Sequence, residues 1–158
     1  MASWTVSTVP HDNKYSPGQQ HSFLMGITKI YKGDIVVLKT DGYVYAAYET
    51  GAGGDQFVGV AAETQDNTLG SVGEKRIDVW LKGVFEFTCV ASNINTALGL
   101  ACYNDRGAGA GTPTTVTVTA GAHAVKVGNI AELIPIAGAV TAAVKCRVRI
   151  APFSAVAS

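Results

Sequence analysis

Apolar and polar side chains alternate along two segments of the chain, RIDVWL at residues 76–81 and VKCRVRI at residues 144–150. A period of two is typical of a β-strand with one buried face, because successive side chains of a strand point to opposite sides. Each segment therefore predicts a strand with one face in the core. The predicted core-facing residues are Ile77, Val79 and Leu81 in the first segment, and Val144, Cys146, Val148 and Ile150 in the second.

Shorter apolar runs are separated by residues that favour turns. Asp41 and Gly42 lie between DIVVLK and YVYAAY, and an Asp-Gly pair in this position predicts a β-hairpin. Further strands are predicted for FVGVAAE, VFEFTC, TTVTVT and HAVKVGNIAELI, and no long segment has the 3.6-residue period of a helix. The pattern predicts an all-β fold, a small barrel or sandwich of short antiparallel strands.

One part of this pattern occurs twice. The segment VGVAAE, which begins at Val58, has a counterpart 69 positions later in VGNIAE, which begins at Val127. At the same offset IDVWL falls on CRVRI with its alternation in phase. We expect two similar β-units, at about residues 30–88 and 97–151, that share one core, with the glycine of each segment at a kink or bulge. The alternative is chance similarity in a chain rich in alanine, valine and glycine.

The N-terminal segment, residues 1–22, contains prolines and many hydrogen-bonding side chains but no strand or helix pattern. We expect an extended arm here, followed by a single β-rich domain over residues 23–158. Apolar side chains on such an arm are stabilised only by docking, either on the body of the same protein or on a neighbouring subunit. The third possibility is plain disorder. The apolar arm residues are Trp4, Val6, Val9 and Tyr15.

Charge narrows the classes of partner. The chain has 12 basic and 12 acidic residues, so its net charge is zero and we expect no nucleic-acid partner. No apolar run approaches the roughly 18 residues of a membrane span, and no signal peptide is visible, so we expect no membrane partner and synthesis in the cytoplasm. Only 15% of the residues are charged, which does little to oppose association and favours a protein that belongs to an assembly.

Candidate chemistry is sparse. The three cysteines, Cys89, Cys102 and Cys146, lack the close spacing of a zinc or redox motif, and we expect reduced thiols, with Cys89 and Cys146 packed in the core. The three histidines have no partner at metal-ligand spacing. The glycine-rich stretches GAGG and GAGAG are not followed by the Lys-Ser/Thr of a phosphate-binding loop. We therefore expect no metal, no cofactor and no catalytic residues, and a protein that is not an enzyme.

Two features of the predicted surface have alternative interpretations. Lys145, Arg147 and Arg149 form a cationic row that is either a solvated face, an edge protected from pairing with other sheets, or a contact with an acidic partner. Trp80 stands on the polar side of its strand. It either fills a second small core, anchors a subunit interface, or stacks on a sugar.

The segments KGDIVVLKTDGYVYAA, DQFVGVAAE and KRIDVWLKGVFEF, followed by the final VKCRVRI, resemble in their order and spacing the capsid cement, or head decoration, proteins of tailed bacteriophages. The resemblance covers residues 32–88 well and the C-terminal half more weakly. It implies a small β-rich structural protein of the virion that binds the major capsid protein on the outer surface of the expanded capsid, commonly as a homotrimer. It also implies a terminal arm that reaches a neighbour, and it supplies no catalytic residues.

Two other functions are compatible with the sequence. One is a carbohydrate- or surface-binding β-module on a phage head or tail, in which Trp80 would stack on the sugar. The other is a small hydrolase on a β-barrel, which requires an acid/base pair brought together by the fold.

Overall fold

The computed structural model describes residues 20–47, 55–90, 98–104, 114–119, 124–134 and 144–153. These ranges form twelve β-strands and no α-helix, which confirms the all-β class. The strands are β1 (Gln20–Leu24), β2 (Lys29–Ile30), β3 (Ile35–Leu38), β4 (Val44–Ala46), β5 (Gln56–Ala61), β6 (Gln65–Asp66), β7 (Arg76–Trp80), β8 (Val84–Val90), β9 (Ala101–Asn104), β10 (Thr115–Thr117), β11 (Lys126–Ile134) and β12 (Val144–Ile150).

The first seven strands form what we call the N-terminal unit. Five of them pair in the order β1-β7-β5-β3-β4, and β2 and β6 form a separate two-stranded ladder. Met25, directly after β1, makes a parallel bridge with Val44 of β4, so the two outer strands meet and the sheet curls towards closure. The predicted hairpin at Asp41 and Gly42 is confirmed, because it joins the antiparallel pair β3–β4 and Gly42 adopts the positive φ (88°) that glycine tolerates.

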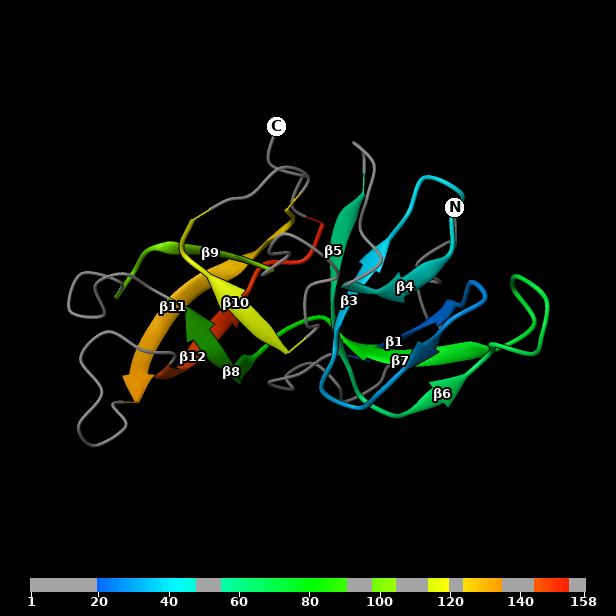
Figure 1. Ribbon diagram of the computed structural model, residues 1–158, viewed down its shortest axis with the longest axis horizontal. Coiled ribbons are helices and arrows are strands. Elements are labelled where there is room, and N and C mark those ends of the chain that lie inside the picture. The colour runs from blue at the N-terminus through cyan, green and yellow to red at the C-terminus, as the bar shows by residue number, and fades with distance from the viewer. Residues whose placement is uncertain are drawn as a thin grey trace, which may run out of the picture.

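The last five strands form the C-terminal unit, a closed barrel in the order β10-β8-β12-β11-β9. Strands β8 and β10 are parallel, and the other neighbours in the barrel are antiparallel. Each strand has a counterpart in the N-terminal unit: β8 corresponds to β1, β12 to β7, β11 to β5, β9 to β3 and β10 to β4. The two units lie side by side in Figure 1, with the barrel on the left and the N-terminal sheet on the right.

The two units also share a bulge. In β5, Val58 is an extra residue opposite β3, since Gly59 pairs with Val36 and Phe57 with Val37. In β11, Val127 is an extra residue opposite β9, and Gly128 follows it. The two bulges therefore stand 69 positions apart, at the same offset as the repeat in the sequence.

The units begin and end at other residues than the sequence repeat suggests. The repeat puts residues 84–88 at the end of the first half, whereas β8, which contains them, pairs with β12 and β10 in the C-terminal unit. The predicted arm reaches residue 22, whereas Gln20–Leu24 pairs with β7 as strand β1. Both differences arise because strand pairing across the fold, rather than local sequence, decides where each unit starts.

Two clusters of buried side chains hold the fold together. The first fills the N-terminal unit, and the second runs from the outer face of the N-terminal sheet into the C-terminal barrel. Strand β3 contributes to both: Val36 belongs to the first, while Ile35 and Val37 belong to the second. Burial on both faces explains why this strand is continuously apolar instead of alternating. The predicted core-facing residues Ile77, Val79, Leu81, Cys146, Val148 and Ile150 are buried.

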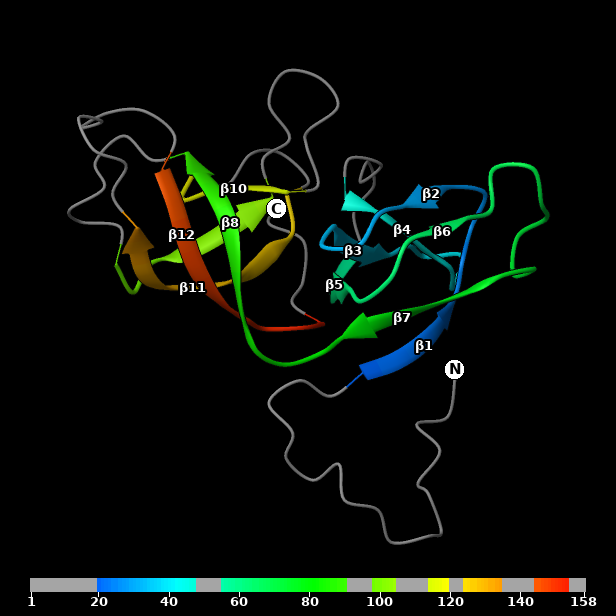
Figure 2. The same ribbon diagram turned by 90° about the horizontal axis from the view of Figure 1, so that it is seen from below.

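The two units also lie side by side in the view of Figure 2, and hydrogen bonds connect them. Asn104, at the end of β9, is buried and its side-chain amide donates to the carbonyl of Ala47 at 3.3 Å. The side-chain oxygen of Asn104 accepts from the backbone N–H of Val125 at 2.7 Å. The backbone N–H of Phe153 donates to the carbonyl of Phe57 in β5. The junction is thus both apolar and hydrogen-bonded.

Candidate functional site

The loop between β6 and β7 projects from the N-terminal unit on the side away from the C-terminal barrel (Figures 1 and 2). Its base is organised by Asn67, a buried residue. The backbone N–H of Asn67 donates to the carbonyl of Thr28 at 2.9 Å. Its side-chain amide donates to the carbonyls of Gly26 at 3.0 Å and Ser71 at 2.8 Å. One side chain therefore ties the β6–β7 loop to the loop that follows β1.

Further hydrogen bonds fix both loops. The backbone N–H of Met25 donates to the carbonyl of Lys75 at 2.9 Å, and that of Gly73 donates to the carbonyl of Met25 at 2.8 Å. The Glu74 carboxylate accepts from the backbone N–H of Ser71 at 2.7 Å. Because both loops have interlocked backbones, the loop surface is ordered before any partner arrives.

The Asp66 carboxylate fixes the first residues of the β6–β7 loop through hydrogen bonds to Thr68. It accepts from the hydroxyl of Thr68 at 2.6 Å and from the backbone N–H of Thr68 at 3.0 Å. These two bonds, the hydroxyl first, hold the pKa of Asp66 below its ordinary value, with a smaller contribution from the charge of Lys29. Asp66 is therefore a carboxylate at neutral pH.

Gly70 stands where the loop has no room for a larger residue. A Cβ at this position would collide with the side-chain oxygen of Asn67 and lie 2.8 Å from the Glu74 carboxylate. That Asn67 oxygen is buried and has no hydrogen-bond partner within the described residues. The Cα–H side of Gly70 faces it, a weak polar contact that any side chain would displace.

The β6–β7 loop and the loop that follows β1 present apolar side chains to solvent. Leu69 is fully exposed, Val72 is 48% exposed, and Ile27, which lies between the two residues bonded to Asn67, is 52% exposed. We call Ile27, Leu69 and Val72 the loop platform. Exposed apolar side chains on two hydrogen-bonded loops make this end of the molecule a candidate interaction surface, since binding residues are often found on ordered loops.

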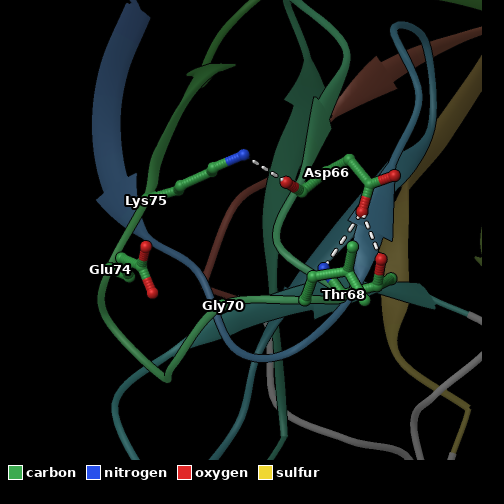
Figure 3. Close-up of a pocket in the computed structure, with 6 residues that line it drawn as sticks. Asp66, Thr68, Gly70, Glu74 and Lys75 are labelled. Carbon is green, nitrogen blue, oxygen red and sulfur yellow. Dashed lines mark hydrogen bonds between the residues drawn. The ribbon is translucent and has the colours of Figure 1, made fainter.

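Beside Leu69 the loop forms a hollow of about 350 Å³ (Figure 3). Lys75 lies across this hollow and donates to the backbone carbonyl of Asp66 at 2.6 Å, while Glu74 lies on the same side as Lys75. The hollow thus has mixed charge. It is lined by Asp66, Thr68, Leu69, Gly70, Glu74 and Lys75.

Replacement of Asn67 by alanine should lower the free energy of unfolding by about 2 kcal/mol, because the buried carbonyl of Gly26 and the half-buried carbonyl of Ser71 lose their donor. Thr68→Ala, which removes only an exposed hydroxyl, is the matched control and should cost well under about 1 kcal/mol. Urea unfolding measures both. Equal, small effects of the two substitutions would show that Asn67 does not hold the loops together.

The structure places Trp80 against the cluster that joins the two units, where the ring is partly buried. Of the three interpretations of this residue, the packing fits a second core, one that lies between the units.

The cationic row lies in the middle of the barrel wall, because β12 pairs with β8 on one side and β11 on the other. The interpretation as a protected sheet edge is therefore wrong. Lys145 makes a 3.2 Å ion pair with Glu86, and Arg147 makes a 2.8 Å ion pair with Glu132. Arg149 is exposed and makes no ion pair with any described residue. Carboxylates of neighbouring strands thus neutralise two of the three cations.

The arm residues Trp4, Val6, Val9 and Tyr15 lie outside the described residues.

All three thiols are buried in the C-terminal barrel. Burial raises the pKa of Cys102 to about 12. A hydrogen bond shared with Cys89, together with burial, also raises the pKa of Cys146. Cys102 and Cys146 are therefore neutral thiols that pack as small apolar side chains, because a nucleophilic cysteine needs an accessible thiolate.

The residues that the structure describes contain neither a candidate metal site nor a candidate membrane-spanning helix. No three His, Cys, Asp or Glu side chains in these ranges come together as a metal site. None of the described segments is a helix of the length and apolarity that crossing a membrane requires.

The loop platform was not predicted from the sequence. The available signal was Leu69, a single large apolar residue within the polar stretch TQDNTLGSVGEK. Neither the burial of Asn67 nor the pairing of two loops 40 residues apart can be read from that stretch, since both depend on long-range contacts.

Comparison with known proteins gave no relatives: no family model, curated protein or solved structure matches this chain.

Proposed function

We propose that this chain is a structural protein of a tailed-phage virion, a decoration or cement protein that binds the outer surface of the capsid and stabilises it. Its partners are the major capsid protein and further copies of itself in a homotrimer. It acts by binding and catalyses no reaction. The segments that resemble the cement proteins run through β3, β4, β5, β7, β8 and β12.

The observation that carries the proposal is that both units repeat one strand order, and that this order leaves few strand edges free. In the barrel every strand has a neighbour on each side, and in the N-terminal unit the outer strands meet at Met25 and Val44. A body with few free strand edges suits a protein that is crowded on a shell, because free edges pair with other chains. Binding only to the mature lattice would stabilise that lattice by mass action.

Light scattering and co-sedimentation test the proposal. We expect the purified protein to be a trimer and to co-sediment with expanded capsids of the parent phage that lack it, but not with unexpanded capsids. A monomer that stays in the supernatant with expanded capsids would contradict the proposal. Glycan binding by that monomer would favour the carbohydrate-binding alternative instead.

The arm has a separate role in this proposal, docking of Trp4, Val6, Val9 and Tyr15 on a neighbour. Deletion of residues 1–18, which leaves β1 intact, should weaken capsid binding or trimer formation at least tenfold and leave the fold unchanged. Burial of ~100 Å² of apolar surface is worth about 2.5 kcal/mol before ordering costs, which is ample for a tenfold effect. Binding by the deletion variant as strong as that of the full chain would contradict this role.

A further inference from the structure

We propose that the loop platform, formed by Ile27, Leu69 and Val72, is the surface through which the chain contacts the capsid shell. This inference rests on the proposed function and makes it specific. The β6–β7 loop lies at the end of the N-terminal unit that faces away from the C-terminal unit (Figures 1 and 2). The chain therefore stands on the shell on its N-terminal unit, and the C-terminal barrel points outward.

The two loops that carry the platform are held in place by hydrogen bonds within the chain. Asn67, Met25 and Gly73 take part in the hydrogen bonds that join the two loops on which the platform residues lie. Loops that are already ordered lose little conformational entropy when they bind, so even a small contact retains most of its affinity. The exposed side chain of Leu69, in contrast, adds nothing to the core.

The exposed apolar area of the platform is small. Three partly or fully exposed side chains offer a few hundred Å² at most, whereas a standard stable interface buries about 800 Å² on each partner. The platform is too small to hold two free copies of this chain together. A contact of this size becomes effective when many copies bind one repetitive surface and other contacts, such as those between subunits of a trimer, hold them in place.

The charged side chains around the platform balance one another. Around the platform the carboxylates of Asp66 and Glu74 are matched by the ammonium groups of Lys29 and Lys75, and Lys29 lies 3.6 Å from Asp66. Without an excess of positive charge the surface does not attract a polyanion such as nucleic acid or an acidic membrane. The occupant that fits is a near-neutral protein surface with an apolar recess for Leu69.

The test compares two double variants in co-sedimentation with expanded capsids. The first is Leu69→Ser with Val72→Ser in the platform. The second is the matched control, Leu98→Ser with Leu100→Ser, which changes two exposed leucines of the C-terminal unit (60% and 45% exposed). We expect the platform variant to bind capsids at least tenfold more weakly, with an unchanged unfolding midpoint and oligomeric state. The control should bind like the unaltered protein.

Each other outcome overturns the inference. Unchanged binding by the platform variant would exclude the platform, and loss of binding by the control alone would reverse the orientation. A platform variant that changes oligomeric state would show that the surface joins copies of this chain. If the unaltered protein itself does not bind expanded capsids, the proposed function fails together with the inference. This outcome can be told apart from failure of the inference alone, because the unaltered protein is measured before the variants.

Discussion

Replacement of Gly128 by alanine should lower the free energy of unfolding by about 3 kcal/mol or more. A Cβ at this position would overlap the backbone carbonyl oxygen of Arg149 on the neighbouring strand and lie 3.0 Å from the Cα of Ile150. Inserted methyl groups usually cost about 1–3 kcal/mol where side chains can move aside. Here the obstacle is backbone, so β11 and β12 would have to separate and lose hydrogen bonds.

The same reasoning applies to Gly59, whose Cβ would overlap the carbonyl oxygen of Trp80, the residue 69 positions before Arg149. Gly42 provides the control, because a Cβ there meets nothing within 4 Å and only the positive φ of 88° opposes alanine. We expect Gly42→Ala to cost about 1 kcal/mol. Urea unfolding of the three variants would contradict this account if Gly128→Ala were no more harmful than Gly42→Ala.

Replacement of Phe57 by alanine should cost about 3–5 kcal/mol, the usual range for a large buried aromatic side chain. Phe57 is completely buried in the cluster that joins the two units. Its removal leaves a cavity at the junction, so we also expect the N-terminal and C-terminal units to unfold less cooperatively.

The chain contains its own control for this substitution. Lys126 stands 69 positions after Phe57 and occupies the corresponding place on β11, where it is only partly buried. Lys126→Ala should cost less than about 1 kcal/mol. Urea unfolding followed by tryptophan fluorescence and by circular dichroism measures both the stability and the coincidence of the transitions. Similar small effects at the two positions would show that the junction contributes little.

Local sequence was sufficient for several features of the fold. The alternation in β7 and β12 identified which of their side chains face the core, and Asp41-Gly42 identified the β3–β4 hairpin. The all-β class followed from the same patterns. These predictions succeed because a period of two and a glycine turn are set by the geometry of the strand itself.

Long-range strand pairing could not be predicted from the sequence. Strand β1 follows a polar segment, and only its ladder with β7 makes it a strand. Strand β8 resembles a continuation of the first unit, and only its pairing with β12 assigns it to the second. The loop platform depends on Asn67, whose side chain binds the carbonyl of Gly26 in a loop about 40 residues earlier.

By itself the sequence determined a strand-built protein, the inward faces of its alternating strands and the 69-residue offset between two similar segments. Only the tertiary structure decided what happens to the outward faces. Trp80 and Arg149 occupy corresponding places in β7 and β12, yet Trp80 packs at the junction while Arg149 is exposed. The physical reason is that a strand's pattern fixes which side chains share a face, but whether that outward face is covered depends on packing against the other unit.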